Sequence, residues 1–133
     1  MEHLTASLII AVSGAIGANA RYFLGLAIQR WAGDNYPWGT FIINVSGSLL
    51  MGILTAWLAQ ASLSPNYRLF LLTGLLGGYT TFSSYSIEAV RLWERKEFAK
   101  AGVYLSSSVV LGFTACAFGV WLARRALGAW GSS

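Results

Sequence analysis

A run of hydroxyl-bearing residues lies inside an uncharged part of the chain, Thr73 to Glu88, which reads TGLLGGYTTFSSYSIE. Six of the seven residues from Thr80 to Ser86 carry a hydroxyl, and no residue between Arg68 and Glu88 carries a charge. Hydroxyls donate and accept hydrogen bonds, so a segment that only had to sit in lipid would not need them. The run is therefore the first candidate for a working site that faces protein or water.

Further hydrogen-bond donors lie in the other apolar stretches of the chain. The ring edges of Phe82 and Tyr85, on roughly the same helical face as Glu88, carry partial positive charge. Such groups can replace part of the hydration of a small anion, which matters because a bare ion in apolar surroundings costs on the order of tens of kcal/mol. The pattern is typical of an anion path but does not name the anion. The donors outside the run are Arg21, Asn44, Tyr104 and Ser108, and Ser83 is the candidate donor within it.

The same residues also have structural interpretations. Phe82 and Tyr85 could be ordinary aromatic packing in a core. Asn44 could hydrogen-bond across helices, which is the commoner case for an amide in a membrane. Arg21 could reach a lipid headgroup or cap a neighbouring helix as readily as attract an ion. Ser106, Ser107 and Ser108 could bond back to carbonyls of their own helix.

The chain carries no set of residues typical of an enzyme. Its single histidine, His3, stands near the N-terminus, and the sequence contains no Ser/His/Asp set, metal-ligand cluster or phosphate-binding loop. A proton-coupled transporter would usually carry a carboxylate within a span. Passive conduction is therefore favoured over catalysis or coupled transport. The acids all lie at or near the ends of the predicted spans: Glu2, Asp34, Glu88, Glu94 and Glu97.

Composition places the chain in a membrane. Of its residues 56% are hydrophobic and 11% charged, whereas ordinary soluble domains carry about 25% charge. The net charge of +4 is spread over loops and ends, so we expect contact with lipid headgroups and not with nucleic acid. The lone Cys116 cannot form a disulfide within the chain. With 133 residues the protein is expected to be a single domain, 1–133.

Four apolar segments are long enough to cross a bilayer, so we expect an all-α integral membrane protein with four transmembrane helices. The third should be broken near its middle, because the pairs Gly77-Gly78 and Thr80-Thr81 disfavour a continuous helix. Small residues at helical spacing in the first two segments should let helices approach closely. The predicted spans are about 4–28, 39–61, 69–87 and 101–123.

The distribution of basic residues gives the chain only a weak orientation bias. Four spans put three basic residues on one side of the membrane and five on the other, which is a small difference under the positive-inside rule. Insertion in both directions is therefore permitted, and the small chain with its small-residue faces suggests a homodimer. The two sets are Arg68, Arg124 and Arg125 against Arg30, Arg91, Arg95, Lys96 and Lys100.

Three segments resemble the signature segments of the Fluc/CrcB family of fluoride channels. They are GAIGANARY at 14–22, WGTFIINVSGSLLMG at 38–52 and GLLGGYTTFSSYSIE at 74–88, and with the four spans they cover nearly the whole chain. The resemblance implies a fluoride-selective passive channel in the cell membrane that exports cytoplasmic fluoride and relieves fluoride toxicity. It also implies an antiparallel, dual-topology homodimer with two pores.

The resemblance further assigns roles to individual residues. It implies a structural Na⁺ at the dimer centre, held by the backbone carbonyls of Gly77 and Thr80. The family's aromatic pair matches Phe82 and Tyr85, and its vestibule amide matches Asn44. Its first-helix arginine matches Arg21, and its pore-end acid matches Glu88. The polar track on its fourth helix matches Tyr104 and Ser108. Tyr85 departs from the family's usual phenylalanine, and Gly112 stands where a further hydroxyl is frequent.

Two other functions fit a small membrane protein of four spans. A small proton-coupled multidrug exporter would have the same size and antiparallel assembly, but it would need a membrane-embedded carboxylate in its first span, where this chain has Arg21. A non-conducting assembly subunit would use only the small-residue faces. A measurement of single-channel current separates that subunit from a channel.

Overall fold

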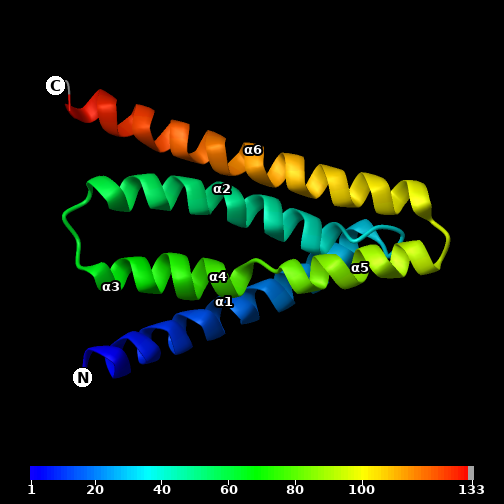
Figure 1. Ribbon diagram of the computed structural model, residues 1–133, viewed down its shortest axis with the longest axis horizontal. Helices are drawn as coiled ribbons and strands as arrows, with labels where there is room; N and C mark the ends of the chain where they lie inside the picture. The colour runs from blue at the N-terminus through cyan, green and yellow to red at the C-terminus, as the bar shows by residue number, and fades with distance from the viewer. Residues whose placement is uncertain (132–133) are drawn as a thin grey trace.

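The computed structural model describes residues 1–131, which form helices running up and down in one bundle (Figure 1). Both described chain ends lie at the same end of the bundle as the connection between the second helix and the segmented one (Figure 1). Residues 132–133, the end of the predicted domain 1–133, lie outside the described residues. The elements are α1 (Glu2–Ala32), α2 (Trp38–Gln60), α3 (Pro65–Arg68), η1 (Leu69–Leu76), α4 (Gly77–Tyr79), α5 (Phe82–Glu94) and α6 (Phe98–Gly131).

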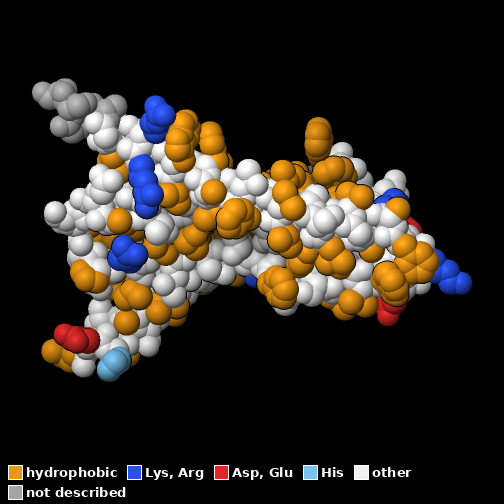
Figure 2. Space-filling model, turned by 45° about the horizontal axis from the view of Figure 1, so that its top comes forward, with side chains coloured by type: hydrophobic (Ala, Val, Ile, Leu, Met, Phe, Trp, Pro, Cys, Tyr) orange, Lys and Arg blue, Asp and Glu red, His pale blue; other side chains and the backbone are white. Residues whose placement is uncertain are grey.

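Three helices in the described part of the chain are long and apolar enough to cross a membrane: Glu2–Ala32, Trp38–Gln60 and Phe98–Gly128. The prediction of an all-helical membrane protein with four helices is confirmed, the third being the segmented one. Helices α1 and α6 extend past the predicted spans 4–28 and 101–123. On the molecular surface, hydrophobic side chains spread over the middle, and charged ones gather towards the two ends (Figure 2).

The segmented helix breaks at Thr80 and Thr81, whose backbones are extended. The break was predicted in the stretch that holds the pairs Gly77-Gly78 and Thr80-Thr81, and it lies there: the glycines remain helical in α4, and the chain opens at the β-branched pair. The Thr81 hydroxyl accepts a hydrogen bond from the Ser84 amide (3.2 Å) and so caps the N-terminus of α5. Before the break, η1 is a π-helix, a winding that is frequent near functional sites.

One side chain from α2 holds the break open. The Thr81 amide donates to Asn44 Oδ1 and the Asn44 amide donates back to the Thr81 carbonyl, both at 2.8 Å. These two bonds supply Thr81 with the partners that a continuous helix would have given its main chain. The cross-helix hydrogen bond considered for Asn44 is therefore present, and its partner is the broken backbone.

Glycines let α1 reach the segmented helix. A methyl group on Gly17 would overlap the Leu75 carbonyl oxygen, and one on Gly78 would stand 2.6 Å from the Gly14 carbonyl oxygen. Any larger side chain at these positions would push the two backbones apart. The close approach expected from the small residues of the first span is confirmed, and it is directed at the segments before the break.

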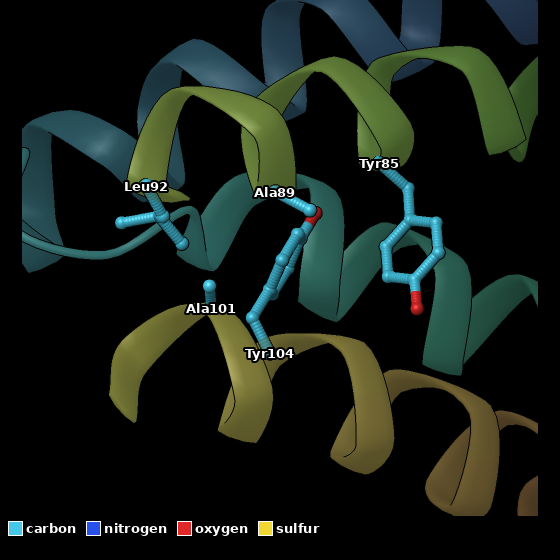
Figure 3. Packing of buried hydrophobic residues seen from close by; sticks show 5 residues of the cluster. All are labelled: Tyr85, Ala89, Leu92, Ala101 and Tyr104. Carbon is cyan, nitrogen blue, oxygen red and sulfur yellow. The ribbon is translucent and has the colours of Figure 1, made fainter. Parts of the chain in front are cut away.

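A cluster of buried residues packs α5 against α6 beyond the break (Figure 3). The ring of Tyr104 points from α6 towards α5 beside Ala89, and Tyr85 points from α5 towards α6. Tyr104 is fully buried, and the Tyr85 hydroxyl donates to the Leu105 carbonyl oxygen (2.7 Å). These contacts fix α5, the helix that follows the break. The helical segments on both sides of the break therefore have defined positions.

Replacement of Asn44 by alanine should destabilise the protein by roughly 2 to 4 kcal/mol, because it leaves the Thr81 amide and carbonyl without their side-chain partners. Chemical unfolding in detergent micelles, followed by circular dichroism, measures this change. Asn19→Ala is the matched control: Asn19 is exposed, and among the described residues its amide bonds only the Ala15 carbonyl of its own helix. The control should lie within about 0.5 kcal/mol of the parent protein. Equal unfolding midpoints for the two variants would contradict the assigned role.

Candidate functional site

The break frees main-chain carbonyl oxygens in the middle of the bundle. The Leu76 carbonyl accepts from the amide and the hydroxyl of Thr80 (both 3.0 Å). The Thr81 amide, which would bond the Gly77 carbonyl in a continuous helix, bonds Asn44 instead. In the described part of the chain, no hydrogen bond outside the helices reaches the carbonyl oxygens of Gly77 or Thr80. These two oxygens are therefore available to a further partner.

Arg21 reaches the same region from α1. Its Nε donates to the Gly78 carbonyl oxygen (3.0 Å), another main-chain group next to the break. The side chain is half-buried and also lines a cavity of about 250 Å³ together with Thr81, Ser84 and Glu88. The structure thus gives Arg21 the helix-capping contact considered from the sequence and leaves its charge beside a polar cavity.

A cleft of about 310 Å³ lies between α2, the break and α6. The ring centroids of Phe82 and Tyr85 are 5.6 Å apart at an interplanar angle of 45°. Phe82 is 77% exposed whereas Tyr85 is 7% exposed, so the phenylalanine ring is the one open to an approaching ion or partner. The polar and aromatic residues that line the cleft include Asn44, Ser48, Thr81, Phe82, Tyr85 and Ser108.

Ser108 contributes an unsatisfied hydroxyl to this cleft. Its Oγ is buried and, within the described residues, has no hydrogen-bond partner. A buried hydroxyl without a partner carries a free-energy cost, so such a group in a native structure is a candidate for binding a ligand or water. The back-bonding considered for these serines occurs at Ser106, whose hydroxyl donates to the Gly102 carbonyl oxygen (2.6 Å), but not at Ser108. The departure at Gly112 lies nearby, since a methyl group there would stand 3.6 Å from Ser48 Oγ.

A second polar group lies one to two turns further along α5. The Tyr104 hydroxyl donates to Glu88 Oε2 (2.7 Å) and the Thr40 hydroxyl donates to Glu88 Oε1 (2.8 Å). The ring centroids of Tyr85 and Tyr104 are 5.1 Å apart, and those of Tyr36 and Tyr104 are 5.5 Å apart with the ring planes at 87°. The carboxylate is thus held by one donor from α2 and one from α6, with aromatic rings beside it.

The structure brings most of the predicted residues into two neighbouring groups. Asn44, Phe82, Tyr85 and Ser108 share the cleft, and Arg21 and Glu88 share the adjoining cavity. Tyr104 is not in the cleft with Ser108, although both were predicted in one track, because its hydroxyl turns to Glu88.

Ser83 is exposed and is not among the residues that line the cleft; its hydroxyl lies 3.4 Å from that of Thr81. Sequence reasoning missed Thr40 as part of the site, and it included Thr81 in the candidate run without giving it a role of its own. The signal for Thr40 was its position one turn before Asn44 on α2. The signal for Thr81 was its place in the hydroxyl run, directly before a residue pattern that starts a helix.

Comparisons with known proteins agree with this architecture. The sequence model of a family described as "CrcB-like protein, Camphor Resistance (CrcB)" matches residues 8–120. A protein of Hyphomonas neptunium is 47% identical over 120 residues, which are 89% of this chain and 94% of the relative. A protein of Caulobacter sp. strain K31 is 42% identical over 92% of this chain and 97% of its own length.

A third relative, from Nitrobacter winogradskyi, is 45% identical over 88% of this chain and 94% of its own length. All three relatives carry the name "Fluoride-specific ion channel FluC". The family match covers most of the chain, and these relatives are 42% to 47% identical to it over most of its length. The resemblance identified from the three sequence segments is therefore confirmed, and the chain belongs to the CrcB family.

Proposed function

We propose that this chain forms a fluoride-selective passive ion channel in the cell membrane, which lets cytoplasmic fluoride leave down its electrochemical gradient and so relieves fluoride toxicity. The observation that carries the proposal is the cleft beside the helix break, where the unsatisfied Ser108 hydroxyl lies near an exposed aromatic ring, Phe82. The names of the relatives supply the identity of the ion. The proposed role is transport, without a catalysed reaction.

The path that we propose follows the two polar groups of the site. A small anion that leaves water needs hydrogen-bond donors or positive ring edges at each step, because a bare ion in apolar surroundings is prohibitively unstable. The Asn44 amide donates to the Thr81 carbonyl, so we propose that Asn44 contacts the ion at the edge of the cleft. The proposed path comprises Asn44, Phe82, Tyr85, Ser108, Tyr104, Glu88 and Arg21, together with Ser83, which is exposed beside Thr81 and outside both groups.

The multidrug exporter receives no support. Helix α1 carries an acid only at its first residue, Glu2, and its buried positions are Ser13 and Gly17. The charged group within α1 that reaches the centre of the bundle is Arg21, which bonds a main-chain carbonyl. The three relatives described above are named as fluoride channels and none as an exporter.

We further propose that two chains assemble as an antiparallel homodimer through the face that contains the break. Gly77 is exposed and its carbonyl oxygen has no donor outside the helices of the described chain, yet a free carbonyl facing lipid is not tolerated. A second copy would cover this face and Phe82.

Insertion in both directions predicts that Lys96→Cys, in a Cys116→Ala background, is labelled by an impermeant thiol reagent from both sides of the membrane. Labelling from one side alone would exclude the antiparallel arrangement.

A structural Na⁺ at the centre of this dimer fits the same carbonyls. Two oxygens per chain, from Gly77 and Thr80, would give four across a two-fold axis, and carbonyl oxygen is a preferred ligand of hard cations. When bound, the ion would supply positive charge between the two broken helices. The residues of this chain hold the oxygens in place through Asn44 and Arg21.

Exchange of Na⁺ for another monovalent cation should lower assembly or activity. Light scattering in detergent is expected to give the mass of two 14.3 kDa chains in sodium. Exhaustive exchange should shift that mass towards one chain or reduce fluoride flux. If mass and flux are both unchanged after exchange, the sodium site is wrong.

The channel activity is tested by ion efflux from liposomes. Vesicles loaded with potassium fluoride or potassium chloride receive valinomycin, and ion-selective electrodes record both anions. Fluoride should leave far faster than from protein-free vesicles, whereas chloride should stay at the protein-free rate. Fluoride efflux at the protein-free rate would refute the channel, and equal chloride efflux would refute its selectivity.

Phe82→Ile should abolish or sharply reduce fluoride flux, because isoleucine keeps the apolar bulk but has no ring edge for the anion. Phe113→Ile is a matched control: Phe113 on α6 is also 77% exposed and does not line the cleft. The control should conduct as the parent protein does. Light scattering checks that the Phe82 variant still assembles. Normal flux through the assembled Phe82→Ile protein would remove the ring from the path.

A further inference from the structure

A cavity of about 660 Å³ lies along α6 near its C-terminal end, at the end of the bundle where both described chain ends lie (Figure 1). Its lining residues are Ala117, Val120, Trp121, Arg124, Arg125 and Gly128. They recur at spacings of three and four positions, so they share one face of α6. A methyl group on Gly128 would meet nothing within 4 Å in the described part of the chain. The cavity is therefore a hollow between long side chains on a single helical face.

This face of α6 points away from the bundle. The opposite face packs against α2, because a methyl group on Gly119 would overlap the Leu49 carbonyl oxygen. Ala123, one turn after Gly119, is also buried, whereas Trp121 is 50% exposed and both arginines of the cavity are exposed. The cavity thus opens towards the surroundings of the protein, outside the cleft beside the helix break.

The formal charge of the cavity is positive. Its lining holds two arginines, Arg124 and Arg125, and neither an acid nor a histidine, which gives a charge of +2. In the described part of the chain neither arginine forms an ion pair; the pair found there joins Lys100 to Glu97. Glu2, which begins α1 at the same end of the bundle, lines a separate cavity beside α3. The hollow therefore suits a ligand that carries negative charge.

Aromatic contacts hold one of these charges at the edge of the membrane span. The Arg125 guanidinium lies over the Trp121 ring, 5.2 Å from its centroid, and that ring stacks on Phe118 at 5.6 Å and 26°. Tryptophan is enriched at the level of lipid headgroups, and the span predicted from hydropathy ends at residue 123. A guanidinium at this level has planar N–H donors that match the oxygens of a phosphate group.

Apolar side chains continue the same face of α6 towards the middle of the span. Val110 and Phe113 precede Ala117 by seven and four positions, which places them in line with the cavity. They are 59% and 77% exposed. A phosphate-bearing ligand in the cavity would thus have an exposed apolar surface next to it, of the kind that an acyl chain covers.

We propose that this cavity binds an anionic phospholipid, with the headgroup phosphate at Arg124 and Arg125 and one acyl chain along Phe113 and Val110. The lipid is favoured over a soluble phosphate because both parts of the surface, the charged hollow and the apolar strip, then have a partner. Basic pockets at the ends of transmembrane helices bind anionic lipids by the same attraction. The site is separate from the proposed ion path.

Lipid binding to the purified protein, measured by native mass spectrometry from detergent, tests the site. Short-chain phosphatidylglycerol and phosphatidylcholine with the same acyl chains are titrated separately. The two lipids share the phosphate and the chains, but only the first has a net negative charge. Phosphatidylglycerol should bind with one molecule per chain and at least about tenfold more tightly, since charge-assisted hydrogen bonds to an uncompensated anion are strong. Equal affinities for the two lipids would overturn the proposal.

Two double variants of equal charge locate the binding. Arg124→Gln/Arg125→Gln should lower the affinity for phosphatidylglycerol to that for phosphatidylcholine. Arg30→Gln/Arg68→Gln removes two charges from exposed positions outside the cavity and should bind as the parent protein does. An equal loss in both double variants would refute the site, because it would show attraction to the overall charge of the protein.

Glycerol phosphate provides the headgroup chemistry without acyl chains. At millimolar concentration it should not displace the bound phosphatidylglycerol; displacement would refute a lipid as the ligand. Circular dichroism checks that each variant is folded. If the double variant in the cavity does not fold, Arg124→Gln and Arg125→Gln alone should each give part of the loss, and unchanged affinity in both would refute the site. The measurement involves no fluoride, so its result is independent of the channel test.

Discussion

The organisation of this protein depends on one constraint: main-chain polar groups at membrane depth must have partners. The break at Thr80 and Thr81 creates several groups that lose their helical partners. Asn44 serves both main-chain groups of Thr81, and Arg21 serves the carbonyl of Gly78. The Thr80 hydroxyl supplements the amide bond to Leu76. The presence of Asn44 and Arg21 within apolar helices is therefore explained by the hydrogen bonds that they make to the broken helix.

The glycines follow from the same constraint. For Asn44 and Arg21 to reach the broken backbone, α1 and α2 must approach it closely. A methyl group on Gly47 would overlap the Thr80 side chain, and one on Gly17 would overlap the Leu75 carbonyl. The small residues on α1 and α2 therefore place two polar side chains within bonding distance, in addition to the van der Waals packing that they allow.

The sequence was sufficient for the fold class and the broken helix, because hydropathy and the glycine and threonine pairs are local signals. It did not show which of the two pairs, Gly77-Gly78 or Thr80-Thr81, opens the helix, and the structure places the break at the second pair. Glycine can remain helical when tertiary contacts require its small size, as the contact of Gly78 with Gly14 does. Local propensity could not reveal that contact.

The division of the candidate site was also beyond the sequence. Tyr104 and Ser108 are one turn apart on α6 and were expected in one track. The hydroxyl of Tyr104 instead bonds Glu88, which is placed by α5, and Thr40 completes that contact from α2. Three separate helices meet there, so the arrangement depends on helix packing that no spacing within one segment encodes.

The π-winding of Leu69–Leu76 restricts how this segment can change in length. Each turn of a π-helix contains more residues than an α-turn, so conversion between the two windings alters the direction of every side chain that follows. Because a π-turn holds about one residue more than an α-turn, loss of one residue here with a return to α-winding would leave Gly78 facing α1 and Thr81 facing Asn44. A one-residue deletion in this segment should therefore come with α-winding of the shortened segment, whereas larger changes in length are expected in the loop between α2 and α3.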